Sequence, residues 1–184
     1  PSLAPEVRDI IGEVDRLDAY VRELLDYARA QTPSVQPIDP RDIVEETIAR
    51  LAPALGRAGV ATSVVDGRAE SSPVDADPQL LGQAMTSIVT NAIEAMPDGG
   101  RITARLEQSG PWLTVSFTDT GPGIPPEIRN RIAEPFFTTK TRGLGLGLAL
   151  TRRMVERFGG KLDIGSGATG AIIGIRLPIT ARTR

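Results

Sequence analysis

Between about positions 40 and 177 the spacing of apolar residues switches repeatedly between helix-like and strand-like periods. This feature constrains the fold most. Helical spacing of apolar residues predicts helices at about 40–56, 78–96 and 146–158. β-Branched and alternating stretches predict strands near 60–65, 101–106, 113–118, 161–164 and 171–177. Because helices and strands are intermixed without regular β-α-β alternation, we expect an α/β fold, a two-layer sandwich in which helices cover a mixed sheet.

Two of these helices have the same start signal. Asp39 and Asp77 are expected as N-cap residues, and Pro40 and Pro78 then occupy the first helical positions. The turn residues at 109–111 predict a hairpin between the second and third strands.

A further helix is predicted at residues 5–30, before the sandwich. Three-four spacing gives an apolar seam of Val7, Ile10, Val14, Leu17, Val21, Leu24 and Ala28. Ile11, Leu25 and Tyr27 widen this seam, which suits a helical bundle better than a two-stranded coiled coil. Three prolines at 31–40 indicate a linker with an extended piece. We therefore expect a dimerising or bundle-forming helix; the alternative is a core helix of the main domain.

Composition excludes several classes of site. The chain has no histidine and no cysteine, which excludes a Ser-His-Asp triad, an HExxH metal site, zinc thiolates and disulfides. Its 21 basic and 23 acidic residues give a net charge of -2, so charge offers no argument for contact with nucleic acid or an anionic membrane. No apolar run approaches the roughly 18 residues of a spanning helix.

Residues 119–125 (DTGPGIP) form the first stretch with candidate ligand-binding residues. Gly121 and Gly123 allow positive φ or the close approach of a flat ligand. The carboxylate of Asp119 only accepts hydrogen bonds, which suits an exocyclic amine such as that of adenine. A strained turn capped by Asp119 explains the same residues equally well.

A second stretch, residues 143–147 (GLGLG), leads directly into a predicted helix. Its three glycines, Gly143, Gly145 and Gly147, alternate with Leu144 and Leu146. Exposed N–H groups at a helix start attract an anion, and the helix dipole adds to this effect. The stretch matches neither a Walker A loop nor a dinucleotide-binding GxGxxG. Phosphate binding is favoured, and a flexible hinge is the alternative.

Asn91 is the third candidate. It lies on the edge of the apolar face predicted for helix 78–96, where an unpaired amide is costly. Its side-chain oxygen suits Mg²⁺, a hard cation that prefers oxygen ligands. Taken alone, a local hydrogen bond is the commoner role for such a residue.

The order of these motifs is more specific than any one of them. Asn91 on a helix, DTGPGI at 119–124, EPFFTTK at 134–140 and GLGLGL at 143–148 follow one another in the chain. This order resembles the N, G1, F and G2 boxes of the catalytic ATP-binding domain of sensor histidine kinases. These kinases share the GHKL or Bergerat fold with DNA gyrase, Hsp90 and MutL. The resemblance covers roughly residues 37–180, and its spacing is most similar to the nitrogen-regulation type.

The resemblance implies ATP or ADP and Mg²⁺ as cofactors. Asn91 would hold Mg²⁺, Asp119 would accept from the adenine amino group, and Lys140 would offer a cation to the phosphates. Phe136 and Phe137 would anchor the lid between the F and G2 boxes. The complete set of implied ATP-binding residues is Asn91, Ala95, Asp119, Gly121, Gly123, Ile124, Phe137, Thr139, Lys140, Gly143, Leu144, Gly145, Leu146 and Gly147.

The resemblance also implies an organisation and a set of partners. Residues 1–32 would be the second helix of the dimerisation and phosphotransfer hairpin, 33–40 a linker, and 41–184 the catalytic ATP-binding domain. Residues 5–30 would form a homodimer in the intact parent. The other partners would be the phosphoacceptor histidine helix and the receiver domain of a response regulator. We expect a cytoplasmic location, and the cytoplasmic part of a membrane-anchored kinase also meets this expectation.

The sequence departs from the family at two points. The phosphoacceptor histidine is absent and the chain opens at Pro1, so we expect a fragment that cannot phosphorylate itself but acts on a separate helix. Ser87 stands where gyrase-type relatives carry a glutamate as general base, which disfavours hydrolysis of that type.

Two alternatives to the kinase remain. One is a non-catalytic ADP- or ATP-binding module that dimerises or docks partners. The other is the class of anti-sigma-factor serine kinases, which is disfavoured because that class lacks a bundle helix and the linker after it.

Overall fold

The computed structural model of the chain describes residues 32–140 and 143–180, together with Val7, Ile11, Val14 and Val21. These four positions are helical, and their side chains are 48–58% exposed. The rest of the helix predicted at 5–30 lies outside the described residues, so its role in a bundle or dimer stays a prediction.

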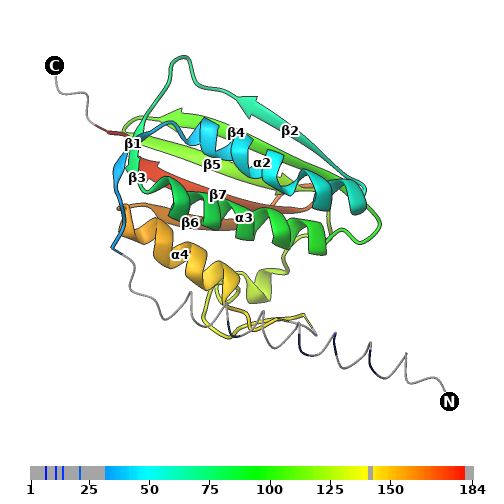
Figure 1. Ribbon diagram of the computed structural model, residues 1–184. Helices are drawn as coiled ribbons and strands as arrows, with labels where there is room; N and C mark the ends of the chain where they lie inside the picture. The colour runs from blue at the N-terminus through cyan, green and yellow to red at the C-terminus, as the bar shows by residue number, and fades with distance from the viewer. Residues whose placement is uncertain are drawn as a thin grey trace.

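A five-stranded mixed sheet forms one layer of the fold (Figure 1). In spatial order its strands are β2 (Val60–Asp66), β4 (Gly100–Ser109), β5 (Trp112–Asp119), β7 (Ala171–Pro178) and β6 (Lys161–Ser166). β2 and β4 run parallel, and the other neighbours run antiparallel. The predicted strands and the β4–β5 hairpin are therefore confirmed.

Three helices form the second layer and cover one face of this sheet (Figure 1). They are α2 (Pro40–Arg57), α3 (Pro78–Glu94) and α4 (Gly147–Arg157), and α3 packs between the other two. The carboxylates of Asp39 and Asp77 cap α2 and α3 as predicted, by accepting hydrogen bonds from first-turn amides. The two-layer α/β sandwich is confirmed.

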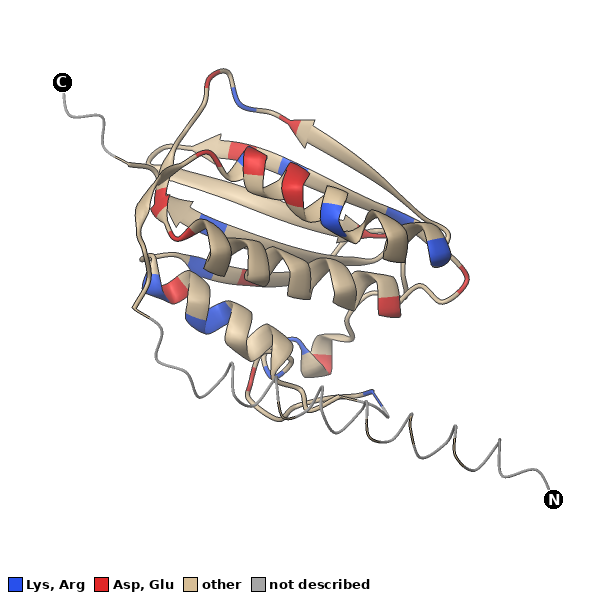
Figure 2. Ribbon diagram, in the orientation of Figure 1, with Lys and Arg blue, Asp and Glu red and all other residues tan. Residues whose placement is uncertain are grey.

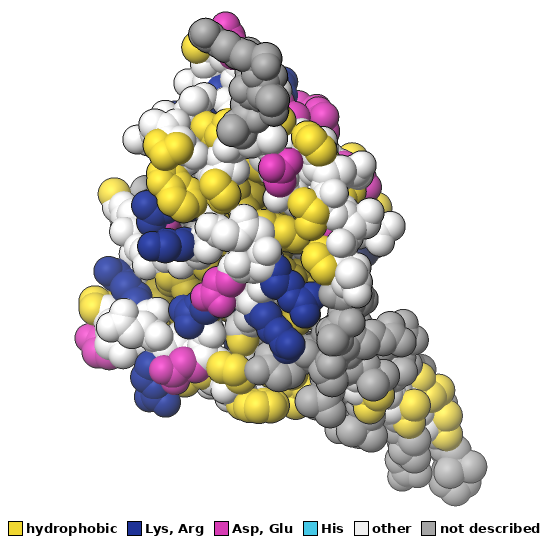
Figure 3. Space-filling model, turned by 90° about the vertical axis from the view of Figure 1, so that its left-hand side faces the viewer, with side chains coloured by type: hydrophobic (Ala, Val, Ile, Leu, Met, Phe, Trp, Pro, Cys, Tyr) yellow, Lys and Arg dark blue, Asp and Glu magenta, His cyan; other side chains and the backbone are white. Residues whose placement is uncertain are grey.

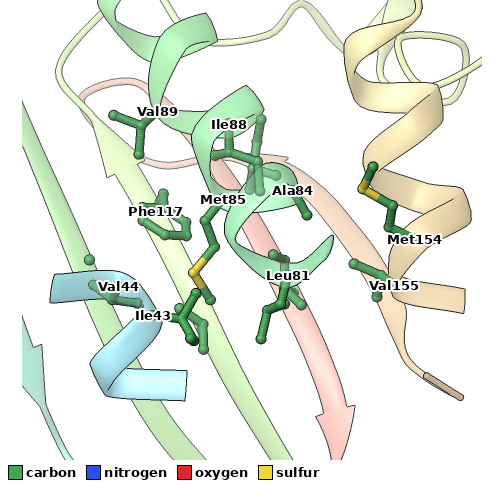
Figure 4. Packing of buried hydrophobic residues seen from close by; sticks show 14 of the residues in the cluster. Ile43, Val44, Leu81, Ala84, Met85, Ile88, Val89, Phe117, Met154 and Val155 are labelled. Atoms are coloured by element: carbon green, nitrogen blue, oxygen red, sulfur yellow. The ribbon is translucent and has the colours of Figure 1, made fainter. Parts of the chain in front are cut away.

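The core lies between these helices and the sheet (Figure 4). Leu81 and Met85 of α3 are fully buried, with Met85 beside Phe117 of β5, while Val44 of α2 and Val155 of α4 close the core on either side. Along β5 every second residue is buried, so the opposite face of the strand is the more exposed one. Each large apolar side chain buried here contributes about 1.5–3 kcal/mol.

Two short elements, β3 and η1, were missed in the sequence, and β1 was expected only as an extended piece. β1 (Gln36–Ile38) and β3 (Val74–Ala76) pair antiparallel, and a 3-10 helix, η1, spans Pro126–Ile128. β1 is the extended piece expected within 31–40, and Ser34 N donates to Asp77 Oδ2 at 2.7 Å next to it. A strand of three residues is too short to show an alternation of apolar and polar side chains. Such a strand is recognised only from the strand with which it pairs.

Arg68 joins the segment after β2 to the start of α2. Its buried guanidinium donates to Asp39 and to both carboxylate oxygens of Asp66, at 2.8–2.9 Å. The hydrogen bond from Arg68 lowers the pKa of Asp66 to about 2. Burial alone would raise the pKa of Asp39, but hydrogen bonds from Arg68, Ser71 and the Arg41 amide outweigh it and lower that pKa. This network fixes the N-terminus of α2 against the sheet.

Charge is unevenly distributed over the helices (Figure 2). α2 carries acidic and basic side chains along its length, whereas α3 has a single charged residue, Glu94, at its C-terminal end. On the face seen in Figure 3, basic, acidic and apolar side chains are interspersed. Among the helices in the described part of the chain, none is both long and apolar enough to cross a membrane.

Candidate functional site

A cavity of about 570 Å³ lies where α3 and β5 end and α4 begins. Its wall contains eleven of the fourteen residues predicted to bind ATP: Asn91, Ala95, Asp119, Gly123, Ile124, Phe137, Thr139, Lys140, Gly143, Gly145 and Gly147. Gly121, Leu144 and Leu146 are not part of the wall. The four motifs, separated by up to about 50 residues in the chain, therefore converge on one site.

Asp119 lies at the end of β5 with its side chain almost entirely buried. Its Oδ1 accepts hydrogen bonds from the amide of Gly121 at 2.9 Å and of Ala171 at 3.0 Å. Within the described residues no protein donor engages Oδ2, and Asp119 lines the cavity. Gly121, which is outside the wall, thus acts on the site by holding the carboxylate whose second oxygen remains available to a ligand.

The backbone after Asp119 is held by a residue that the sequence did not single out. Ser166, at the end of β6, accepts from the Ile124 amide at 2.9 Å and donates to the Ile124 carbonyl at 3.1 Å. Arg129 Nε donates to the same carbonyl at 3.0 Å. Gly123 has φ +76°, a left-handed conformation that favours glycine. The predicted adenine loop is therefore fixed from two sides.

The glycine-rich segment contacts the F box directly. A Cβ on Gly145, where φ is +69°, would lie 2.4 Å from the carbonyl oxygen of Phe137, so only glycine fits. Gly147 begins α4 and approaches Ser87 and Asn91 of α3. This arrangement brings the positive end of the α4 dipole to the cavity, as expected for an anion site.

The intervening leucines lie outside the wall of the cavity. Leu146 is fully buried and Leu144 is half-buried, and neither lines the cavity. The three glycines line the cavity and the two leucines do not, and the part in ATP binding implied for Leu144 and Leu146 stays a prediction.

The F-box phenylalanines also differ from each other. Phe137 lines the cavity, and the guanidinium of Arg131 lies 4.5 Å from its ring centroid. Phe136 is 62% exposed and has φ +67°. Among the described residues, the structure therefore gives a ring contact to Phe137, and the anchoring role of Phe136 stays a prediction.

Lys140 crosses the mouth of the cavity to α3. Its Nζ donates to Asn91 Oδ1 at 2.7 Å and also to the carboxylate of Glu94. Asn91, Glu94 and Lys140 all line the cavity. The amide oxygen of Asn91 and the carboxylate oxygen of Glu94 are hard ligands of the kind that Mg²⁺ prefers. The Lys140 ammonium between them takes the place that a metal cation would occupy. Asn91 therefore fits its predicted role, and Glu94 joins it.

Sequence reasoning missed much of the wall: Ile88, Thr90, Ala92, Glu94, Phe117, Pro122, Pro125, Ile128, Ile132, Thr138, Leu148, Ala171 and Ile173, while Ser87 had been noted for another reason. Two signals were available. Ser87, Asn91 and Glu94 share one face of a helix, and Phe117 and Asp119 share one face of a strand. No local signal identifies Ala171 or Ile173, which arrive by the pairing of β7 with β5.

Residues 76–181 match the family described as "Histidine kinase-, DNA gyrase B-, and HSP90-like ATPase". The chain belongs to this family. Its motifs and cavity are thus those of a histidine kinase-like ATPase domain. The nitrogen regulation protein NtrY of Azorhizobium caulinodans is 34% identical over 94% of this chain and 23% of its own length. The signal transduction histidine-protein kinase AtoS of Escherichia coli is 34% identical over 92% of this chain and 28% of its own.

Solved structures of histidine kinases share the fold of this ATPase domain. Full-length ShkA in complex with AMPPNP superposes with a TM-score of 0.81 at 25% identity, covering 96% of this chain and 39% of ShkA. Histidine kinase ThkA in complex with the response regulator protein TrrA gives a TM-score of 0.82 at 26% identity, covering 100% of this chain and 53% of ThkA. The chain spans only about a quarter of the length of NtrY and AtoS.

Proposed function

We propose that this chain is the ATP-binding catalytic part of a two-component sensor histidine kinase. It positions Mg–ATP for transfer of the γ-phosphoryl group to a histidine that this chain does not contain. The carrying observation is the cavity with Asp119 on one wall and Asn91, Lys140 and the start of α4 on others. The named relatives and the AMPPNP complex of ShkA support this proposal.

The adenine would bind beside Asp119. Oδ2 of this residue accepts from the exocyclic amine, while Oδ1 stays with the two amides that fix it. The apolar wall from Phe117, Ile124 and Ile173 suits a flat base. Gly123 allows the backbone to approach the ring closely.

The phosphates would lie at the start of α4. Gly145 and Gly147 present backbone there, and the helix dipole favours negative charge. Asn91 would hold Mg²⁺, which when bound neutralises phosphate charge and orients the chain of phosphates. No described side chain activates a nucleophile, which suits a transfer catalysed by positioning and electrostatic stabilisation. Ser87 lacks a carboxylate, so we propose no gyrase-type hydrolysis.

Partners and organisation belong to the same proposal. Residues 1–32 would form the second hairpin helix and a homodimer interface in the parent protein, joined by 33–40 to the catalytic domain at 41–184. A response regulator receiver domain would take the phosphoryl group from the histidine, as the ThkA–TrrA complex suggests by analogy. We place the domain in the cytoplasm, where ATP is available.

The test mixes this chain with γ-labelled ATP, Mg²⁺ and a separate peptide that forms a two-helix hairpin. The second helix of the peptide corresponds to residues 5–30, and the helix before it carries a histidine. We expect acid-labile label on the peptide, because phosphohistidine is acid-labile, and no label on this chain. AMPPNP binding is measured in parallel by calorimetry. Tight binding without transfer to any such peptide would favour the second candidate, a nucleotide-dependent docking module.

A further inference from the structure

Two oxygen-bearing side chains at the end of α3 converge on one cation. Asn91 Oδ1 lies 2.7 Å from Lys140 Nζ, and the Glu94 carboxylate accepts from the same Nζ. Asn91 and Glu94 are three residues apart on a helix, a spacing that places side chains next to each other. We call these two residues the cation seat.

The position of Glu94 is unfavourable without a cation. It is the sole charged residue of α3 and lies at the C-terminal end, where the helix dipole disfavours negative charge (Figure 2). α3 has no basic residue in its last turn. Glu94 also lines the cavity, where a bare carboxylate would repel a nucleotide phosphate. Lys140 therefore compensates a charge that the helix itself does not.

The chemistry of the seat fits a divalent metal as well as an ammonium. An amide oxygen and a carboxylate oxygen are ligands of the kind that Mg²⁺ and Mn²⁺ take. Lys140 and Glu94 have side chains 42% and 52% exposed, so the ammonium leaves without opening the core. Both cations need the same two oxygens and therefore exclude each other.

We propose that Lys140 occupies the seat of Asn91 and Glu94 in the nucleotide-free chain and that the metal of Mg–nucleotide displaces it. Glu94 is then a metal ligand beside Asn91, and the released Lys140 ammonium is free to meet the phosphates. The inference rests on the proposed function for the nucleotide, but the exchange of Lys140 against a divalent metal stands on its own. It predicts that nucleotide binds with metal far better than without it.

The first measurement uses the fact that Lys140 and Lys161 are the sole lysines of the sequence. With ¹³C-labelled lysine, two Cε–Hε resonances report these side chains, and a Lys161→Met variant assigns them. Lys161 begins β6 and does not line the cavity, so it is an internal control. Mg²⁺–AMPPNP is expected to shift the Lys140 resonance and leave that of Lys161. Mn²⁺ alone is expected to broaden Lys140 selectively.

The second measurement is the affinity for Mn²⁺ without nucleotide, read from the electron paramagnetic resonance of the free ion. Lys140→Met removes the competing ammonium and should tighten Mn²⁺ binding roughly fivefold. Glu94→Gln removes a charged ligand and should weaken it roughly tenfold. Lys161→Met makes the same change of net charge as Lys140→Met and should leave the affinity unchanged.

The outcomes separate the exchange from the proposed function. If calorimetry shows Mg²⁺–AMPPNP binding while the Lys140 resonance stays in place, the exchange is overturned and the proposed function stands. If AMPPNP does not bind at all, the proposed function fails, and the Mn²⁺ affinities still decide the exchange. Equal Mn²⁺ affinity in the wild type, Lys140→Met and Glu94→Gln overturns it. Circular dichroism checks that each variant is folded.

Discussion

Oγ of Ser166 lies 2.9 Å from the amide nitrogen of Ile124 and 3.1 Å from the carbonyl oxygen of the same residue. One hydroxyl thus uses its donor and its acceptor to hold both polar groups of a residue 42 positions earlier in the chain. Ile124 lies in the loop that we propose to receive adenine. The end of β6 therefore holds a loop of the cavity whose motifs lie elsewhere in the sequence.

Removing this hydroxyl should loosen the loop. We expect Ser166→Ala to weaken ADP binding by about 1–2 kcal/mol, since it leaves the Ile124 amide without its partner. Isothermal calorimetry measures the change. Ser116→Ala is the matched control, because Ser116 makes only a 3.5 Å contact on β5 to the Arg105 carbonyl. Identical ADP affinities in the two variants would show that the loop does not depend on Ser166.

Asp119→Asn should weaken adenine nucleotide binding by about 1–3 kcal/mol, because a charge-assisted hydrogen bond to the amino group is lost. The asparagine oxygen still accepts from the Gly121 and Ala171 amides, so the fold should persist. Asp163→Asn, which alters an exposed ion pair with Arg176 on the same sheet, serves as the control. Unchanged affinity for ADP would remove Asp119 from the adenine site.

Gly145→Ala should abolish the contact between the glycine-rich segment and the F box. The added Cβ would meet the Phe137 carbonyl oxygen at 2.4 Å, so one of the two segments must move. We expect nucleotide affinity to fall by more than about tenfold, equivalent to about 1.4 kcal/mol. The measurement is calorimetry with AMPPNP.

Gly110→Ala provides a close control for that variant. Gly110 has φ +57°, so alanine there suffers similar backbone strain, but nothing lies within 4 Å of the added Cβ. Gly145→Ala should lose more stability than Gly110→Ala, because only its Cβ meets a neighbouring segment, and only Gly145→Ala should lose nucleotide. If both lose nucleotide equally, general destabilisation explains the effect.

The Arg68 network should make stability depend on acid pH. Because the folded state lowers the pKa of Asp66 from 3.8 to about 2, and lowers that of Asp39, both carboxylates contribute stability above their unfolded pKa. That contribution is fully present above about pH 5 and is lost as pH falls through the folded values towards 2. Urea unfolding at a series of pH values between neutral and strongly acidic measures it.

Arg68→Met should remove that pH dependence together with about 3 kcal/mol of stability, as expected when one partner of a buried ion pair is deleted. Arg105→Met, which breaks an exposed pair with Glu107, should change stability little. An Arg68→Met chain that keeps the wild-type slope below pH 4 would show that other carboxylates govern acid unfolding.

Much of the fold follows from local chemistry. The caps Asp39 and Asp77 satisfy first-turn amides within three residues, and the period of apolar side chains fixes which face of α3 or β5 is buried. These effects act over a few residues, so they are present in the sequence. Ala171 and Ile173 show the limit, because no local pattern marks them and they reach the cavity only through the pairing of β7 with β5.

The sequence by itself determined the two-layer α/β class, the helices and long strands, and the family to which the order of Asn91, Asp119 and the glycines belongs. Tertiary structure alone decided that Ser166 holds Ile124, that Ala171 fixes Asp119, and that Glu94 shares Lys140 with Asn91. These contacts join residues 42 to 52 positions apart. Each depends on strand pairing and helix packing that bring distant segments together, and no local period or propensity records such an encounter.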